Sequence, residues 1–469
     1  MVITTATSAS GIDHDRLGRA AVRVLIENWH GHATVPSRSL YPHQWSWDSA
    51  FIALGLQHFA PRRAAAELLS LFGAQWDDGR IPHIAFNPAV ADDAYFPGPS
   101  FWRSVDRKGH PPIDTSGIIQ PPVHAIAAAA VVHGLGPEGR AFADRVYPYL
   151  VAQSSYLRGR RTVGELAAVV HPWETGLDNS PAWDAPLHAV PSDLSLFQTY
   201  TRRDLDHARA SERPTNEDYS RYIRLALAYR DSGYDDDWVR QHGEFLVVDP
   251  AFNALWARSE LALAEIARNL GRDSRGHLAE AARITAALVD QLWSESRSLF
   301  LARDERSDRL LPERTVAGLI PLILPGLPGH HVSAMYETLA GDCFQAGSEG
   351  VRGVPSFDLT DPRYDPQRYW RGPSWLNTTW LVASGLAVHG KEGLSGCAMT
   401  WWPWSRTPVS GSTSIRRPAP GTAPRTSAGQ QRCSSTSSPK ARWMRASRRP
   451  FKCWRTANPC RGQLHLTST

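Results

Sequence analysis

The chain has 469 residues, of which 42% are hydrophobic and 10% aromatic, and its formal net charge is +5. This composition is typical of a globular protein with a sizeable core, and no apolar run approaches the roughly 20 residues that cross a bilayer. Residues 1–13 lack a basic start followed by an apolar stretch, so we expect no secretory signal, no membrane contact and a cytoplasmic location.

The elements predicted for residues 14–394 are almost all helices, because apolar residues recur there at helical spacing and strand-like alternation is rare. The predicted helices are 16–30, 46–59, 61–76, 122–135, 139–157, 216–231, 252–270, 275–293, 313–324 and 373–389. Ser46 or Asp48 caps one of them and Thr215 caps another. So many amphipathic helices form a solenoid or a closed helical barrel, and the lack of a fixed repeat disfavours the solenoid.

The first cluster of aromatic and polar residues lies at the start of the helix predicted for 46–59. Residues 41–51 read YPHQWSWDSAF. Indole rings stack on the apolar faces of sugars, and the neighbouring polar groups can bind sugar hydroxyls. Alone, such a cluster is more often explained by tryptophans that anchor a helix in the core.

The longest predicted loop, residues 77–121, is rich in Pro, Gly and aromatic residues and contains the run YFPGPSFW at 95–102. Aromatic-rich loops of this length inside a compact domain are usually functional. We therefore expect this loop to cover a pocket.

The segment 171–184, HPWETGLDNSPAWD, combines three carboxylates (Glu174, Asp178 and Asp184) with Trp173 and Trp183. Carboxylates among indole rings can hold a sugar and protonate a leaving oxygen, because apolar surroundings raise the pKa of a carboxylic acid. A surface loop rich in turn-forming residues is the alternative. A third cluster, YWRGPSWLN at 369–377, makes a sugar site the better explanation of all three.

The order WSWD, WETGLDNS and YWRGPSW resembles glycoside hydrolase family 63 over residues 12–394, and the trehalase family more distantly. Within family 63 it is most similar to small bacterial enzymes that hydrolyse mannosylglycerate or glucosylglycerate. The resemblance implies an all-α (α/α)6 barrel, or toroid, with aromatic-rich loops over the pocket. It also implies hydrolysis of a small glycoside with inversion at the anomeric carbon, without a metal or other cofactor.

The expected substrate is glucosylglycerate, cleaved to glucose and glycerate. Mannosylglycerate hydrolase and another α-glucosidase or trehalase-like enzyme stay open as alternatives. A sugar-binding protein without catalysis is the alternative of a different class.

The resemblance also assigns roles to individual residues, with Asp178 as the general acid. The residues expected to bind the substrate are Tyr41, Gln44, Trp45, Trp47, Asp48, Gln120, Trp173, Arg213, Tyr219, Trp370 and Trp375. Arg213 and Tyr219 are candidates for the aglycone carboxylate, which a guanidinium group binds well; a capping or surface role for Arg213 is the alternative. Glu174 and Asp184 are expected to serve as pocket and scaffold residues.

Residues 395–469 differ sharply from the rest, with eleven Arg, two Lys and no Asp or Glu. Residues 1–394 therefore carry 38 basic and 46 acidic residues, a net charge of −8, and keep only one of the five cysteines, Cys343. A lone cysteine suits a reducing compartment. We expect a catalytic domain over 1–394, incomplete at its C-terminal end, and a disordered tail over 395–469.

An inverting glycosidase needs a second carboxylate, about 6.5–9.5 Å from the acid, to activate water. The family places this base near the C-terminus in a Phe-x-Glu-Tyr setting, followed by a Phe-x-Trp-Thr-Ala-Ala-Leu helix, whereas the tail has no acidic residue. Codons shifted by one base allow Phe-x-Glu-Tyr at 412–415 and Phe-Gly-Trp-Thr-Ala-Ala-Leu at 427–433. We infer a frameshift near residue 394 and an inactive, poorly folded chain.

Nucleic-acid binding by the tail would rest on charge alone, so the expected partner is only a small glycoside. The sequence leaves a homo-oligomer open.

Overall fold

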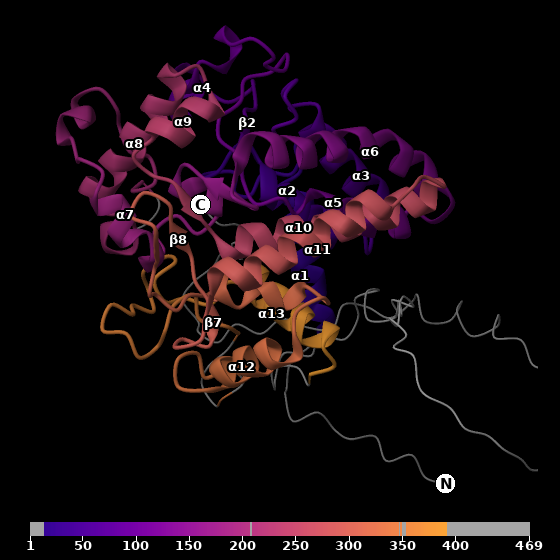
Figure 1. The fold of residues 1–469 in the computed structure, drawn as a ribbon. Coiled ribbons are helices and arrows are strands. Elements are labelled where there is room, and N and C mark those ends of the chain that lie inside the picture. Colours follow the sequence, from indigo (N-terminus) through magenta and orange to yellow (C-terminus); the bar gives the residue numbers. More distant parts are fainter. Residues whose placement is uncertain (1–13, 207–208, 347, 349–352, 392–469) are drawn as a thin grey trace, which may run out of the picture.

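The computed structural model describes residues 14–206, 209–346, 348 and 353–391, and these are mostly helical (Figure 1). The expected tail, residues 395–469, lies outside the described residues. The longer helices are α1 (His14–Glu27), α2 (Ser46–Leu56), α3 (Pro61–Phe72), α5 (His124–Gly134), α6 (Gly139–Tyr156), α8 (Asn216–Asp231), α10 (Pro250–Leu270), α11 (Arg275–Leu292), α12 (Gly329–Ala340) and α13 (Leu376–Val388). The shorter helices are α4 (Pro99–Trp102), α7 (Asp184–His188) and α9 (Asp236–His242).

The strands are short and antiparallel. Five of them form a sheet in the order β3-β4-β5-β8-β9, where β3 is Thr162–Val163, β4 Leu166–Val169, β5 Val247–Val248, β8 Arg303–Asp304 and β9 Arg309–Leu310. Two further pairs join β1 (Gln44–Trp45) to β2 (Ile84–Ala85) and β6 (Trp293–Ser294) to β7 (Leu299–Phe300). The β1–β2 pair places the first aromatic cluster beside residues 83–85.

Helix α10 forms the centre of the helical part and packs against α5, α6 and α11, as Figure 1 shows. Its start is fixed by Pro250 and by Asp249, whose side chain accepts a hydrogen bond of 2.6 Å from the Phe252 amide. Helix α5 is buried along most of its length, and its run of alanines at 127–130 lets neighbouring helices approach closely. A helix that is apolar on all sides belongs in the interior.

Nine of the ten predicted helical segments are helices in the structure, and the prediction for 313–324 is wrong. That segment forms two 3-10 turns, Val316–Gly318 and Ile320–Ile323, instead of one α-helix. Pro321 lacks the amide hydrogen that a helix interior needs. A Cβ atom on Gly318 would lie 2.3 Å from the carbonyl oxygen of Phe300, so this turn packs directly on a strand. Helix α12 was not predicted.

The long loop 77–121 is less irregular than expected, since it contains β2, α4 and two 3-10 turns. Trp102 at the end of α4 is fully buried and donates its indole hydrogen to the Pro97 carbonyl at 3.2 Å. The loop is therefore anchored in the core on both sides of Tyr95 and Phe96. None of the described helices is long and apolar enough to cross a membrane.

Candidate active site

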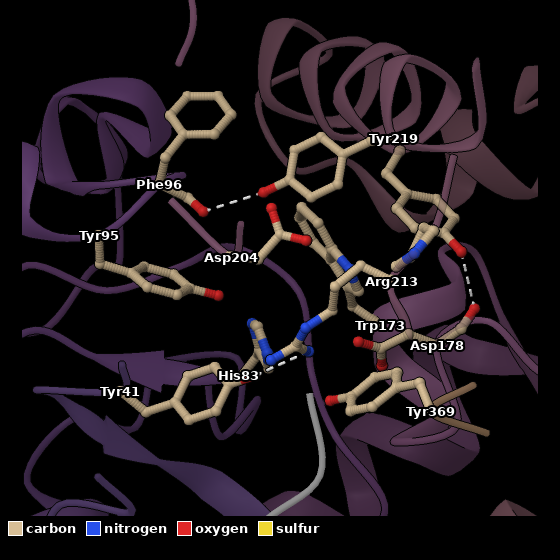
Figure 2. Close-up of a pocket in the computed structure, with 12 residues that line it drawn as sticks. Tyr41, His83, Tyr95, Phe96, Trp173, Asp178, Asp204, Arg213, Tyr219 and Tyr369 are labelled. Atoms are coloured by element: carbon tan, nitrogen blue, oxygen red, sulfur yellow. Dashed lines mark hydrogen bonds between the residues drawn. The ribbon is translucent and has the colours of Figure 1, made fainter. Parts of the chain in front are cut away.

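A pocket lies among segments that are far apart in the sequence (Figure 2). Its lining residues are Tyr41, His83, Tyr95, Phe96, Trp173, Asp178, Asp204, Arg213, Pro214, Tyr219, Tyr222 and Tyr369. Seven of the twelve are Phe, Tyr or Trp, and three carry a carboxylate or a guanidinium group. Aromatic walls with a few charged groups suit a small polar ligand such as a sugar.

Asp178 presents a buried carboxyl group to this pocket. Its Oδ1 atom has no hydrogen-bond partner, and its main-chain carbonyl accepts a hydrogen bond of 2.9 Å from the Tyr222 hydroxyl. Burial raises the pKa of Asp178 to about 7, although the positive charge of Arg213 opposes the rise. A carboxyl group with this pKa can hold a proton near neutral pH and transfer it to a bound ligand.

The backbone before Asp178 is shaped by Gly176, which has a φ of +70°. A Cβ atom at this position would lie 2.4 Å from Cζ2 of Trp47. Only glycine permits both the left-handed conformation and this close approach. Gly176 therefore brings the loop of Asp178 against the first aromatic cluster.

Asp48 is a second buried carboxyl group, in the first turn of α2. Neither of its oxygens has a hydrogen-bond partner, and it is 1% exposed. Burial raises its pKa well above the usual value, and the charge of Asp178 adds to the rise. Because buried polar groups are normally hydrogen-bonded, the free oxygens of Asp48 mark a place where a ligand hydroxyl would be bound.

Several buried donors near these carboxyl groups also lack a partner. They include the indole nitrogens of Trp45, Trp47 and Trp370 and the amide nitrogen of Gln120. Gln120 is held in place because its Oε1 atom accepts a hydrogen bond of 3.1 Å from the Trp47 main chain. The sequence-predicted residues thus supply both free donors and free acceptors.

Arg213 lies in the pocket wall between two tyrosines. It donates a hydrogen bond of 3.2 Å to the Tyr41 hydroxyl, and its guanidinium carbon lies 4.7 Å from the ring centre of Tyr369. Burial alone would lower the pKa of Arg213, but Tyr41, Tyr369 and Asp204 together raise it. Arg213 is therefore a fixed positive charge suited to a carboxylate.

Tyr219 and Trp173 complete the predicted residues that line the pocket. The Tyr219 hydroxyl donates to the Phe96 carbonyl at 3.1 Å, which ties α8 to the aromatic loop. Trp173 lies parallel to the His83 ring, with 6.3 Å between ring centres. Both side chains are buried and present flat surfaces to the pocket.

Seven of the predicted binding residues are not among those that line the pocket: Gln44, Trp45, Trp47, Asp48, Gln120, Trp370 and Trp375. The amide nitrogen of Gln44 donates to Ser49 and to Glu67, and its oxygen accepts from Ser70 at 2.9 Å, so its side chain supports the first cluster from behind. Trp375 stacks on Trp370 with 4.6 Å between ring centres.

Glu174 and Asp184 form scaffold ion pairs. Glu174 pairs with Arg161, and its carboxylate also accepts hydrogen bonds from the main-chain amides of Ile119 at 3.2 Å and Val170 at 2.8 Å. Asp184 forms two hydrogen bonds, of 2.8 and 2.7 Å, with Arg371. These pairs tie the loop 171–184 to the segment of Gln120 and to the third cluster.

Asp204 and Tyr222 line the pocket although no sequence motif predicts them, whereas His83, Tyr95 and Phe96 belong to the loop 77–121 predicted as a cover. Neither ring nitrogen of His83 has a partner, and burial lowers its pKa to about 3, so His83 is neutral. Nothing in the local sequence of Asp204 distinguishes it from a surface residue. Within the described part of the chain, no group of three or more His, Cys, Asp or Glu side chains could hold a metal ion.

The chain is similar to known glycoside hydrolases over most of its length. Residues 41–410 match the family described as the mannosylglycerate hydrolase MGH1-like glycoside hydrolase domain. A mannosylglycerate hydrolase from Rubrobacter radiotolerans is 39% identical over 382 residues, which are 79% of this chain and 85% of that protein. A glucosylglycerate hydrolase from Mycolicibacterium hassiacum is 34% identical over 394 residues, 80% of this chain and 86% of that protein.

A solved structure is also similar. The family 63 mannosylglycerate hydrolase from Thermus thermophilus with bound Tris aligns with a TM-score of 0.73 at 37% identity, covering 80% of this chain and 88% of that one. Further crystal structures of that enzyme contain Tris with D-glycerate, or glucose.

Proposed function

Because the chain belongs to the mannosylglycerate hydrolase MGH1-like family of glycoside hydrolases, in family 63, we propose that its pocket is built to hydrolyse an α-glycoside of glycerate. The observation that carries this proposal is the buried carboxyl group of Asp178, with its unpartnered oxygen, beside Arg213 in an aromatic pocket. The two groups suit the two ends of such a substrate, its glycosidic oxygen and its carboxylate.

In the proposed reaction Asp178 is the general acid. It donates its proton to the glycosidic oxygen as the bond from the anomeric carbon to that oxygen breaks, which releases the aglycone as an alcohol. Water attacks the opposite face of the sugar and loses a proton to a second carboxylate, so the configuration inverts. The raised pKa of Asp178 supports the first step.

The sugar ring is proposed to lie over the first and third aromatic clusters. Asp48 would accept hydrogen bonds from two hydroxyls, and the free donors of Trp47 and Gln120 would bind sugar oxygens. The aglycone carboxylate is proposed to bind Arg213, with Tyr219 on the same side. The related crystal structures contain D-glycerate or glucose, which supports a pocket with one part for the sugar and another for the aglycone.

Glucosylglycerate, the substrate expected from the sequence, and mannosylglycerate are both candidates. A relative of each specificity is similar to this chain, at 34% and 39% identity. The two sugars differ in the orientation of one hydroxyl, which pocket residues distinguish through hydrogen bonds rather than through size.

We also propose that the helices form an (α/α)6 barrel that lacks its last helices, and that residues 395–469 are translated out of frame. The family match ends at residue 410, ahead of the segments 412–415 and 427–433 that a one-base shift converts to the family pattern. The base would then be absent from this chain. All residues that line the described pocket lie between positions 41 and 369, so this chain could bind a glycoside that it does not cleave.

Titration calorimetry of the full chain with glucosylglycerate, mannosylglycerate and trehalose tests the binding part of the proposal. We expect at least one glycerate glycoside to bind and trehalose to bind less tightly. Arg213→Met should weaken glycerate-glycoside binding by about 10- to 100-fold, because a charged hydrogen-bonded pair is lost. Arg209→Met, a change at an exposed arginine, should leave it unaltered.

Tighter binding of trehalose, or binding of glycerate glycosides that is insensitive to Arg213→Met, would contradict the proposal. The first outcome would favour a trehalase-like specificity. The second outcome would show that Arg213 has only a structural role.

A further inference from the structure

Asp204 is an acidic pocket residue to which the proposed reaction assigns no task. It follows the 3-10 turn Leu194–Gln198 and shares the pocket wall with Asp178 and Arg213. In Figure 2 its carboxylate points into the pocket near the Tyr219 hydroxyl, away from the Asp178 side. In the proposed binding mode, a carboxylate at this position would face the aglycone rather than the sugar.

The carboxylate of Asp204 is held rigidly by Arg202. Its two oxygens accept hydrogen bonds of 3.0 Å from Nε and 2.7 Å from Nη2 of this arginine. The remaining nitrogen, Nη1, donates to the Pro214 carbonyl at 3.0 Å and to Asn216 at 2.9 Å. These bonds use four of the five N–H groups of Arg202, whose side chain is buried.

The same arrangement fixes Asp204 relative to Arg213. Arg202 contacts the carbonyl of Pro214, the next residue after Arg213, and its guanidinium carbon lies 4.3 Å from the ring centre of Tyr219. One buried arginine therefore sets the spacing between the carboxylate of Asp204 and the guanidinium of Arg213.

The negative charge of Asp204 affects the pKa of other pocket residues although Asp204 is paired with Arg202. Burial raises the pKa of Tyr219 well above its usual value and raises that of Asp178 to about 7, and in both cases Asp204 adds to the rise. The aglycone end thus offers one positive group, Arg213, and one negative group, Asp204.

We propose that Asp204 is a specificity-determining residue that selects a singly charged hydroxy-acid aglycone and excludes an aglycone with a second anionic group. This inference rests on the proposed function, because it requires Arg213 to bind the first carboxylate. An ionised carboxylate can only accept hydrogen bonds, so it favours an aglycone with a hydroxyl group that donates one. A second anion would face Asp204 without a free counter-charge, since the charge of Arg202 is already paired with Asp204.

Glycerate and hydroxymalonate form a matched pair of probes. Both carry a carboxylate and a hydroxyl on the neighbouring carbon, but the third carbon is an alcohol in glycerate and a carboxylate in hydroxymalonate. We expect the full chain to bind glycerate at least about tenfold more tightly in calorimetry, because of the like-charge repulsion.

Asp204→Asn should reduce this preference to within about threefold, since it removes the charge and keeps the shape. Because Asp204→Asn leaves Arg202 without its counter-ion, the double variant Arg202→Gln/Asp204→Asn provides a second test with both charges removed. Asp206→Asn, at an exposed position that does not line the pocket, should keep the full preference. The same variants in the frame-restored protein should shift KM for glycosides of the two acids in parallel.

Equal binding of both acids by the unaltered chain, or an unchanged preference in both Asp204 variants, would overturn the role of Asp204 and leave the proposed function standing. Failure of both the full chain and the frame-restored protein to bind glycerate would overturn the aglycone site itself, and the inference with it.

Discussion

At the scale of single residues, the chemistry of the site depends on a carboxyl group that is stable in its protonated form. Asp178 and Asp48 are both buried without full hydrogen bonding, which costs folding energy whenever they are ionised. Such a cost is tolerated where a ligand later supplies the missing partners. The unpaired oxygens are therefore better explained by function than by stability.

The titration of Asp178 leads to a stability prediction. Its pKa of about 7 lies above the ordinary 3.8, so the folded state binds the proton more tightly than the unfolded state. The stabilisation that the protonated Asp178 carboxyl group gives the folded protein is fully present below the pKa of the unfolded state. It is lost as the pH rises through the pKa of the folded state. Asp178→Asn, which does not titrate, should therefore gain about 2–3 kcal/mol in free energy of unfolding over the wild type between about pH 5 and pH 8.

Urea denaturation of both proteins at the two pH values measures this difference. Asp93→Asn, at a strongly exposed position, provides the control and should show no such gain. A gain for Asp178→Asn that is the same at both pH values would mean that Asp178 is ionised in the folded protein.

Sequence patterns could identify the residues that share a motif but not those that meet across space. Asp178 and Tyr41 are predicted because they lie in such motifs, and Arg213 because of the family resemblance; the structure places all three in one pocket. His83 and Asp204 lie outside these motifs and reach the pocket only through the β1–β2 pairing and the Arg202 contact. Such contacts depend on tertiary packing, which the spacing of residues along the sequence does not predict.

At the scale of elements, the site is built from loops that are locked to helices at a few points. The loop 171–184 is fixed by Glu174 at one end and by Asp184 at the other, and Gly176 allows it to touch Trp47. Local signals predicted elements whose ends are defined by caps, such as α8, which begins after the capping Thr215. They failed for 313–324, where Pro321 and close packing of Gly318 override the helical spacing of apolar residues.

Gly176→Ala tests the close contact between the loop and the first cluster. We expect it to destabilise the protein by about 3 kcal/mol or more, because it combines backbone strain with overlap of a buried indole ring. Gly271→Ala is the matched control, since Gly271 also has a positive φ, +75°, but nothing lies within 4 Å of its Cβ position. It should cost only about 1–2 kcal/mol. Equal losses in urea denaturation would show that Trp47 moves freely and that the contact does not fix the loop.

At the scale of the whole molecule, the proposed acid and the expected base lie in different parts of the chain. The residues that line the described pocket lie between positions 41 and 369 and include Asp178, the proposed general acid, whereas the expected base belongs to a region that carries no acidic residue after position 394. An inverting mechanism needs both groups. The central claim is therefore that this chain has the pocket and the acid of a glycerate-glycoside hydrolase but lacks its base.

The most direct test is hydrolysis of glucosylglycerate and mannosylglycerate by the chain as written, by a frame-restored protein and by its Asp178→Asn variant. We predict that the frame-restored protein cleaves at least one of the two, and that the other two proteins are about 10²–10⁴-fold slower or inactive, because each lacks the base or the acid. Turnover by the chain as written at a rate comparable to that of the frame-restored protein would contradict the account.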